Sequence, residues 1–413
     1  MRPDKRPRGP RRPESTPPSG PPTPGLAQLN ERATSLWRRG QAWFYADDLM
    51  RPVHAAELVR VVDAEGRPCG LAVTSPASKL ALRACGPWDG EAIPDREAFF
   101  ATRLAAAIER RAGMLGPRDG ARLVHGEADD LPGLVVDRYG SVLVLQVTSQ
   151  FVESSLDAIV PFLAERLSAE TVIARNDVAV RKLEGLPQEV RLLHGARKEQ
   201  VEIDENGLAH LVEPFTGHKT GFYLDQRPAR AMVRELSKGR SVLDLFSYQG
   251  AFSLSALKGG ATSATAVDQS ARALELAQLG AQKNGLTGLT TERANVFDYL
   301  RSLRESDRRF DLIVLDPPAF AKSRRELDGA LRGYRDLNRQ AMRLLAPHGW
   351  LVTCSCSHHM TPPMFEDMAR QASGGLPFKI ALHQRIGAGA DHPVWLSMPE
   401  SEYLKTLVLR RMD

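Results

Sequence analysis

Beyond about Gly221 the sequence alternates regularly between short apolar stretches and longer amphipathic ones. The apolar stretches predict strands and the amphipathic ones predict helices. Strands that are separated by helices pair in parallel, so this half of the chain is expected to form a parallel, doubly wound α/β sheet. The predicted elements are strands 241–245, 263–267, 290–294, 310–315 and 350–355, and helices 251–257, 271–284, 296–303 and 333–345.

The sequence before this sheet has a different pattern. Short strand-like pieces, punctuated by Gly and Pro, run to about Trp88 and predict a small β-barrel or sandwich. Helix and strand patterns then mix, and a hairpin is expected around the turn Asn206-Gly207. We therefore expect four segments: a disordered basic, Pro-rich tail at 1–25, the small β domain at 26–96, a central α/β domain at 97–199, and the doubly wound domain with its leading hairpin at 200–413.

The composition limits the class of protein further. Hydrophobic residues make up 42% of the 413 residues, so most of the chain can bury a core. Six basic and two acidic side chains in residues 1–25 account for most of the net charge of +5, so basicity says little about the rest of the chain. Four cysteines without a CxxC pair exclude a disulfide scaffold. No apolar run reaches the roughly 18 residues that span a bilayer, and no secretory signal is evident, so a cytoplasmic protein without a membrane partner is expected.

Polar residues follow successive strands of the predicted sheet, where ligands of such sheets bind. The first strand leads into a tight turn, Asp244-Leu-Phe-Ser-Tyr-Gln-Gly250, which is not the GxGxxG of a dinucleotide site. Asp268 ends the second strand, where an acid typically binds ribose hydroxyls, and Asn295 and Asp298 follow the third. Each acid alone is at least as well explained as a helix cap or a solvated residue. Together they favour one nucleoside with a small charged group, such as S-adenosylmethionine.

The ends of the last two strands carry a candidate reaction centre. Asp316-Pro317-Pro318 is a rigid loop, although an acid there also serves as a strand terminator. Cys356 ends the next strand and comes close to Asp316 if the two strands are neighbours, which makes its thiol a candidate nucleophile. Cys354 is expected to be an inert core residue. The adjacent pair His358-His359 lacks partners at ligand spacing, so no metal site is expected.

These residues resemble a known family over nearly the whole folded length, the bacterial large-subunit rRNA cytosine-C5 methyltransferases with an N-terminal PUA domain. The string from His218 to Arg227 and the triplet Ser355-Cys-Ser357 are the most specific matches. The other matching segments are 35–39, 74–78, 126–127, 131–133, 136–138, 176–181, 244–250, 316–320, 332–334 and 391–393. The fold that the resemblance implies is a PUA domain, a central α/β domain and a class I, Rossmann-like methyltransferase domain.

The resemblance also implies roles for particular residues. The nucleophile falls on Cys356, with Asp316 beside the methyl group and the base. S-adenosylmethionine would be bound by Gln226, Arg227, Asp244, Phe246, Ser247, Tyr248, Gly250, Asp268, Asn295, Asp298 and Asp316. The expected partner is 23S rRNA, unassembled or early in assembly, because the target base must be unstacked. Candidate RNA contacts are Arg38, Arg39, Lys322 and Arg332, although the last two equally suit a solvated helix face; a homodimer stays open.

Two other functions stay open at this point. The loop from Asp316 to Phe320 also resembles the acid-Pro-Pro-aromatic loops of amino methyltransferases, in which the aromatic ring stacks on the base and no thiol is needed. Such an enzyme would methylate a nitrogen of guanine or adenine in rRNA. A non-catalytic RNA-binding or ribosome-assembly protein could keep the same fold as a scaffold, although the acids at four strand ends argue against it.

Overall fold

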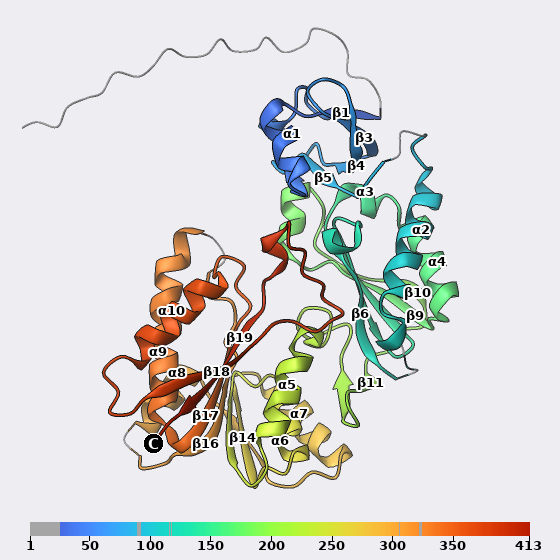
Figure 1. The fold of residues 1–413 in the computed structure, drawn as a ribbon. Coiled ribbons are helices and arrows are strands. Elements are labelled where there is room, and N and C mark those ends of the chain that lie inside the picture. The colour runs from blue at the N-terminus through green and yellow to red at the C-terminus, as the bar shows by residue number, and fades with distance from the viewer. Residues whose placement is uncertain (1–24, 89–91, 115, 117, 305, 322–323) are drawn as a thin grey trace, which may run out of the picture. The chain divides into compact units, whose positions relative to one another are not determined.

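The computed structural model describes residues 25–88, 92–114, 116, 118–304, 306–321 and 324–413 (Figure 1). Within these ranges the chain forms two compact units, of which the first ends at Pro94 and the second runs from Asp95 to Asp413. The tail expected at 1–25 lies, apart from Gly25, outside the described residues. Each unit has its own sheets and its own hydrophobic core.

The first unit is built on a five-stranded sheet. Leu29, Val59 and Leu82 belong to the hydrophobic core of this unit. The strands are β1 (Leu26–Gln28), β2 (Trp43–Phe44), β3 (Leu58–Val62), β4 (Pro68–Thr74) and β5 (Leu82–Ala84), in the order β1-β3-β4-β5-β2. The prediction of a small β-rich domain before residue 88 is therefore confirmed.

A helix in this unit, α1 (Glu31–Arg38), is missing from the sequence prediction, which has only strands there. The helix begins at Asn30, whose side-chain oxygen accepts a hydrogen bond from the backbone N–H of Ala33 at 2.8 Å. Its apolar face is short, and Trp37 stacks on Phe44 of β2 with ring centroids 5.4 Å apart. The helix has only eight residues, of which three are apolar, so it is too short for its period to stand out, and its main signal is the capping residue.

The second unit starts with a five-stranded central sheet. Its strands are β6 (Gly120–His125), β7 (Leu134–Tyr139), β8 (Val142–Val147), β9 (Thr171–Arg175) and β10 (Val190–Gly195), in the order β10-β9-β8-β7-β6. The helices here are α2 (Arg96–Glu109), α3 (Gln150–Glu153) and α4 (Leu156–Leu167). The strand β10 was not predicted, because it is an edge strand whose side chains are mostly exposed and lack an apolar alternation.

The predicted hairpin is confirmed. Strands β11 (Val201–Asp204) and β12 (Ala209–Val212) pair antiparallel, with Asp204 opposite Ala209. Asn206 and Gly207 both have positive φ, 55° and 74°, as a two-residue type I′ turn requires. The chain then passes through the loop 213–226 into α5 (Arg227–Leu236) and the large sheet.

The large sheet has seven strands in the order β15-β14-β13-β16-β17-β19-β18. These are β13 (Ser241–Leu245), β14 (Ser263–Asp268), β15 (Leu289–Arg293), β16 (Phe310–Leu315), β17 (Leu345–Ser355), β18 (Ile380–Ile386) and β19 (Lys405–Arg411). The first five are parallel, so the predicted doubly wound sheet is confirmed for them. The antiparallel pair β19 and β18 was not predicted. No α-helix lies between these two strands in the sequence, so they do not follow the strand–helix alternation on which the prediction was based.

Helices cover both faces of this sheet (Figure 1). Besides α5, the helices are α6 (Ala251–Lys258), α7 (Ala271–Lys283), α8 (Val296–Leu303), α9 (Leu327–Arg343) and α10 (Pro362–Ser373). One core contains apolar residues of α8, α9 and α10, such as Leu300, Leu337 and Phe365, and the other contains residues of α5 and α6, such as Val233 and Phe252. Helix α9 begins six residues earlier than predicted, while α5 and α10 were missed.

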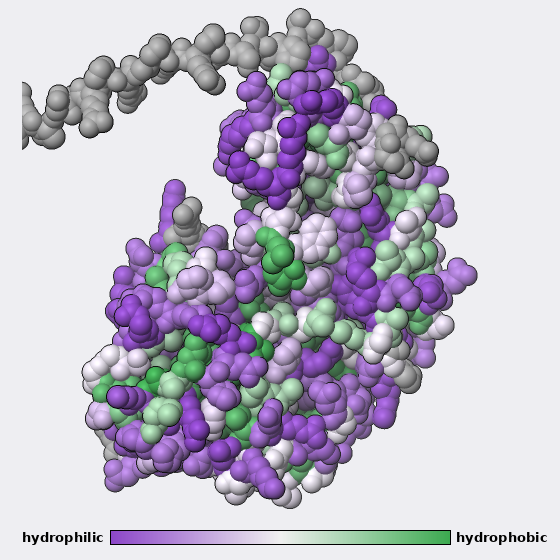
Figure 2. Space-filling view, viewed as in Figure 1, coloured by the Kyte–Doolittle hydropathy of each residue, from purple (hydrophilic) through white to green (hydrophobic). Residues whose placement is uncertain are grey.

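The strand order places the topological switch between β13 and β16. From β13 the chain moves outward through β14 to β15, and then returns to add β16 on the other side of β13. A crevice therefore opens at the carboxyl ends of these strands, where such sheets bind ligands. The visible surface is mostly hydrophilic, with apolar residues scattered over it (Figure 2). Among the described residues, no helix has the length and hydropathy to cross a membrane.

Candidate active site

A cavity of about 320 Å³ lies at the carboxyl ends of the central strands of the large sheet. Residues after β13, β14, β16 and β17 contribute to its wall, together with the loop 213–226 that precedes α5. Its lining residues are His218, Lys219, Phe222, Tyr223, Asp225, Gln226, Arg230, Phe246, Ser247, Tyr248, Gln249, Ala251, Phe252, Asp268, Gln269, Val296, Asp316, Pro317, Pro318, Cys356 and Leu404. The predicted convergence of strand ends therefore produces a real cavity.

The turn after β13 has an unusual backbone. Phe246, Tyr248 and Gly250 have positive φ values of 62°, 49° and 67°. Phe246, Ser247 and Tyr248 line the cavity, where the sequence predicted cofactor contacts. Gly250 does not line the cavity; a Cβ there would lie 2.8 Å from the Cβ of Ala277, so glycine is required for packing against α7.

Asp244 lies below this turn rather than in the cavity. Its carboxylate is fully buried and accepts hydrogen bonds from the backbone N–H of Ser253 at 3.0 Å and from the Ser253 hydroxyl at 2.7 Å. Burial raises the pKa of Asp244 to about 7, although the two hydrogen bonds from Ser253 act to lower it. Asp244 thus fixes the start of α6 and is not part of the cavity wall.

Asp268, at the end of β14, does line the cavity. One carboxylate oxygen accepts the backbone N–H of Tyr248 at 2.8 Å, and the other accepts that of Ser270 at 2.9 Å. A carboxylate oxygen has a second lone pair, so both oxygens can still accept ligand hydroxyls. This arrangement fits the predicted ribose contact.

Unpartnered polar atoms in the wall show that the cavity suits a polar ligand. Among the described residues, the Ser247 hydroxyl, both amide atoms of Gln249 and one carboxylate oxygen of Asp225 are buried without a hydrogen-bond partner. Buried polar groups are nearly always satisfied in folded proteins, so a bound group is expected to supply the missing partners. A nucleoside with an amino-acid tail, as in S-adenosylmethionine, carries hydroxyl, amino and carboxylate groups that can do so.

Asn295 and Asp298 were predicted cofactor contacts, but the structure places neither in the cavity wall. The side-chain oxygen of Asn295 accepts the backbone N–H of Phe297 at 2.9 Å and caps α8. The Asp298 side chain is 68% exposed and pairs with Arg301 at 2.8 Å. The physical reason is the helix start, because a capping side chain turns back onto its own helix. Val296 lines the cavity instead.

Gln226 and Arg227 were predicted to close the pocket, and only Gln226 does so. Arg227 opens α5 and its guanidinium pairs with Glu205 at 3.3 Å and Asp391 at 3.8 Å. It also donates to the backbone carbonyl of Gly120 in β6. Arg227 therefore ties α5 to the central sheet and not to the cavity.

Asp316 projects into the cavity from the end of β16. One oxygen of its carboxyl accepts the amide N–H of Gln226 at 3.0 Å. Burial, supported by the negative charge of Asp225, raises the pKa of Asp316 to about 7. A carboxyl group with such a pKa can hold or release a proton near neutral pH, as general acid–base catalysis requires.

The strands β16 and β17 are neighbours, so the condition for placing Cys356 beside Asp316 is met. Cys356 follows β17 directly, is half-buried and lines the same cavity as Asp316. Burial raises the pKa of the Cys356 thiol, while the nearby Lys219 ammonium opposes the rise. Cys354 is fully buried, accepts a hydrogen bond from the Thr406 hydroxyl at 3.3 Å and does not line the cavity, as a packing residue should.

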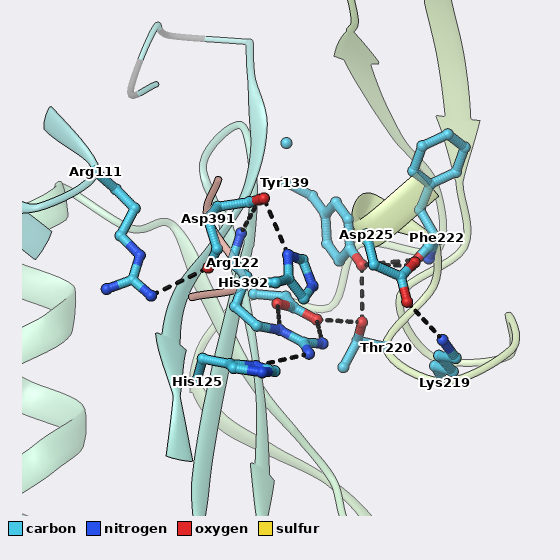
Figure 3. A network of polar contacts seen from close by, with 12 residues as sticks. Arg111, Arg122, His125, Tyr139, Lys219, Thr220, Phe222, Asp225, Asp391 and His392 are labelled. Atoms are coloured by element: carbon cyan, nitrogen blue, oxygen red, sulfur yellow. Dashed lines mark hydrogen bonds and ion pairs between the residues drawn. The ribbon is translucent and has the colours of Figure 1, made fainter. Parts of the chain in front are cut away.

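Several lining residues were not singled out from the sequence, above all Lys219 and Asp225. They form an ion pair of 3.2 Å (Figure 3). The Tyr403 hydroxyl donates to the same Asp225 oxygen at 2.7 Å. His218 stacks on Tyr248 with ring centroids 4.4 Å apart. The only signal was the specific string from His218 to Arg227, in which a lysine and an aspartate stand six residues apart.

None of the described candidate RNA-binding residues is part of the cavity wall. Arg38 is 60% exposed and pairs with Asp63 at 3.1 Å, and Arg39 is exposed beside Ser35. Arg332 is exposed on α9 and lines a separate surface groove, while Lys322 lies outside the described residues. No three His, Cys, Asp or Glu side chains within the described ranges are grouped as metal ligands would be.

Phe320 is the aromatic residue on which an amino methyltransferase would depend. Its ring packs against Tyr334 at 4.7 Å and against Phe297 at 6.2 Å. It belongs to the periphery of the core formed by α8, α9 and α10, and it is not part of the cavity wall. Cys356 therefore lines the cavity, whereas Phe320 does not.

Comparison with known proteins agrees with this geometry. A family model described as S-adenosylmethionine-dependent methyltransferase matches residues 122–386, and a PUA-like domain model matches residues 27–85. A protein named ribosomal RNA large subunit methyltransferase I from Shewanella amazonensis is 42% identical over 359 residues, which cover 86% of this chain and 90% of that relative. The protein of the same name from Aeromonas salmonicida is 39% identical over 388 residues, with coverages of 92% and 97%.

Solved structures share the fold. A crystal structure described as a candidate methyltransferase complexed with SAH superposes with a TM-score of 0.82 at 23% identity, covering 93% of this chain and 99% of that one. A methyltransferase structure from Streptococcus mutans gives a TM-score of 0.80 at 24% identity with the same coverages. The chain therefore belongs to the family of S-adenosylmethionine-dependent methyltransferases that carry a PUA-like domain, which its resemblance to that family had led us to expect.

Proposed function

We propose that this enzyme transfers the methyl group of S-adenosylmethionine to carbon 5 of a cytosine in 23S rRNA, with Cys356 as the nucleophile. The observation that carries the proposal is a half-buried thiol that shares one cavity with a carboxyl group whose pKa is about 7, that of Asp316. The names of relatives at 39% to 42% identity support rRNA as the substrate.

The chemistry accounts for both groups. Carbon 5 of cytosine is a weak nucleophile, so the ring must first be activated. The Cys356 thiol loses its proton to the Asp316 carboxylate, and the thiolate electron pair forms a bond to carbon 6. The protonated Asp316 then donates a hydrogen bond to N3 of the base, which stabilises the electron density that moves into the ring. S-adenosylmethionine, when bound, supplies the electrophilic methyl group.

The enzyme must then be regenerated. A base removes the proton from carbon 5, the electron pair of that C–H bond restores the 5,6 double bond, and the bond between carbon 6 and sulfur breaks. Cys356 leaves as the thiolate and recovers a proton. The thiol is therefore consumed and returned in each cycle, and a side chain without sulfur at this position cannot replace it.

Residues around the turn after β13 are suited to hold the methyl donor. The aromatic rings of Phe246 and Tyr248 offer apolar surface for the nucleoside, and Asp268 offers acceptors for ribose hydroxyls. Ser247 and Gln249 carry the buried polar atoms that a ligand would satisfy. None of these contacts uses Asn295, Asp298 or Arg227.

We assign RNA docking to the PUA-like unit at 26–96, with Arg38 and Arg39 as phosphate contacts and Arg332 as a further contact on α9. We assign residues 97–199 to a central α/β domain and residues 200–413 to the catalytic domain. The target nucleotide must leave its stack to reach Cys356, which favours unassembled or early-assembly rRNA in the cytoplasm.

The experiment is a nucleoside analysis. Purified enzyme is incubated with isotope-labelled S-adenosylmethionine and unmodified large-subunit rRNA, the RNA is digested, and the labelled nucleoside is identified by mass. Labelled 5-methylcytidine that disappears in Cys356→Ala is the expected result. A labelled purine nucleoside with unchanged turnover in Cys356→Ala would instead establish nitrogen methylation, and bound cofactor without any labelled RNA would favour a scaffold.

A further inference from the structure

Lys219 occupies an unusual place in the cavity wall. Its backbone has a positive φ of 53°, which is uncommon for a residue with a side chain and is kept only where the surroundings determine it. The Nζ atom lies 4.4 Å from the centroid of the Tyr223 ring and 3.2 Å from a carboxylate oxygen of Asp225. The side chain still has 38% of its surface exposed and lines the same cavity as Cys356.

The partner of this lysine is held firmly. The Asp225 side chain is only 4% exposed, and the Tyr403 hydroxyl donates to the oxygen that also binds Lys219. The other Asp225 oxygen is buried without a partner among the described residues. Burial raises the pKa of Asp225, but Lys219 and the other donors outweigh it and hold the pKa well below the usual range. The carboxylate therefore stays ionised and keeps the ammonium charged.

The loop itself is fixed by the central sheet (Figure 3). The Thr220 hydroxyl donates to Asp137 of β7 at 2.6 Å, and the Tyr139 hydroxyl accepts the backbone N–H of Phe222 at 3.2 Å. The two carboxylate oxygens of Asp137 in turn accept hydrogen bonds from Nε and Nη2 of Arg122, at 2.7 and 2.8 Å. Thr220 and Phe222, which closely follow Lys219 in the loop, are thus anchored to the central sheet, so the ammonium keeps its place at the cavity.

We propose that Lys219 is the cation that stabilises the thiolate of Cys356 before it attacks carbon 6, and that Asp225 and Tyr403 position its ammonium group for this task. The proposal rests on the proposed function, since it explains how the nucleophile of that reaction is activated. When the thiol proton moves to Asp316, the charge of the cavity is unchanged, but a negative charge moves onto sulfur. A fixed cation in the wall of the same cavity lowers the free energy of that state.

The other charged groups around Cys356 do not replace Lys219. Lys405 of β19 also acts on the thiol, but its ammonium donates to the backbone carbonyls of Ser357 and Tyr403 and does not line the cavity. The negative charges of Asp316 and Asp225 raise the pKa of the Cys356 thiol, and the positive charge of Lys219 lowers it. The phenols of Tyr223 and Tyr248, which line the cavity, have pKa values raised mainly by burial and stay neutral.

The test measures the thiol directly, without RNA or cofactor. The full-length protein is alkylated with iodoacetamide over a range of pH, and mass spectrometry with fragment-ion localisation separates Cys356 from Cys354 on the same peptide. Only the thiolate reacts, so the pH profile gives the pKa of Cys356. In Lys219→Gln we expect this pKa to rise by about one unit, with about tenfold slower alkylation at neutral pH. Lys219→Arg should stay close to the wild type.

Lys283→Gln is the matched control, since Lys283 is a surface lysine on α7 that also forms an ion pair, with Glu202 at 2.7 Å. It should leave the profile unchanged. Thermal unfolding verifies the fold of each variant, and Lys219→Met gives the same readout should Lys219→Gln not fold. The proposal would be overturned if the pH profile of Cys356 alkylation stayed unchanged in a folded Lys219 variant that lacks the positive charge. Failure of the proposed function is separate, because it would appear as the wrong labelled nucleoside.

Discussion

Replacing Asp316 with asparagine tests the proton transfer on which the proposed mechanism depends. Burial raises the pKa of Asp316 to about 7, and the mechanism needs its carboxylate form to accept the thiol proton. The wild-type rate should therefore increase as the pH rises through about 7, and at one unit below this pKa it should be about tenfold below its plateau. In Asp316→Asn the amide oxygen can still accept the Gln226 hydrogen bond, but no proton can be taken up. We expect a loss of about 10²–10⁴-fold in rate and no inflection near pH 7.

The assay is single-turnover transfer of labelled methyl groups to saturating rRNA, measured from about pH 5.5 to 8.5 at constant ionic strength. Asp244→Asn is the control, because burial raises the pKa of Asp244 to about 7 as well, although this side chain lies outside the cavity. The control should keep the inflection near pH 7. An Asp316→Asn enzyme that retains the inflection, or an Asp244→Asn enzyme that loses it, would refute the assignment of the proton acceptor.

Three further tests have defined outcomes. Cys356→Ala should abolish methyl transfer to cytosine, whereas Cys354→Ala should keep most of it because that thiol is buried outside the cavity; equal losses in the labelled-nucleoside assay would contradict this. Asp268→Ala should weaken S-adenosylmethionine binding by about tenfold to a hundredfold in calorimetry, from loss of hydrogen bonds to a charged group, while Asp298→Ala should not. Thr220→Val should lower the free energy of unfolding in urea by about 1.5–3 kcal/mol, since it removes a buried hydrogen bond to the carboxylate on β7; no measurable change would show that this contact is dispensable.

The candidate reacting groups could be brought together from the sequence because parallel strands bring their carboxyl ends to one edge of the sheet. Asp316 and Cys356 are 40 residues apart in the chain, yet the alternating pattern alone indicated that both follow strands of one sheet. The one undetermined condition was the order of the strands, and β16 and β17 are neighbours. The alternation of predicted strands and helices was therefore sufficient to place candidate residues that directly follow a strand.

The same reasoning was wrong where a side chain has a local alternative. Asn295 stands at a strand end, as Asp268 does, but its side chain caps α8 and does not reach the cavity. Arg227 follows Gln226 in the most specific string of the sequence, yet the first turn of α5 directs it to Glu205 and Asp391. Position in a motif fixes where the backbone runs, whereas the direction of a side chain depends on the hydrogen bonds available to it.

The loop 213–226 shows what sequence patterns cannot supply. Lys219 and Asp225 have no periodicity that marks them, and their partner Tyr403 comes 178 residues after Asp225. The antiparallel strand β19, which Tyr403 precedes, was itself missed. An ion pair of this kind depends on three segments that meet only in the folded protein, so no local pattern predicts it.

In the proposed mechanism the central sheet supports the reaction without touching the reactants. Among the described residues, none from 97–199 lines the cavity, yet Asp137 and Tyr139 of β7 hold Thr220 and Phe222, the residues that follow Lys219 closely in the loop. An active site stabilises developing charge best when its charged groups need not reorganise during the reaction. A loop anchored to a second sheet meets this condition, because the ammonium of Lys219 is already in place when the thiol ionises. In the proposed mechanism the central sheet therefore supports the environment of the Cys356 thiol, because it holds the loop that carries Lys219.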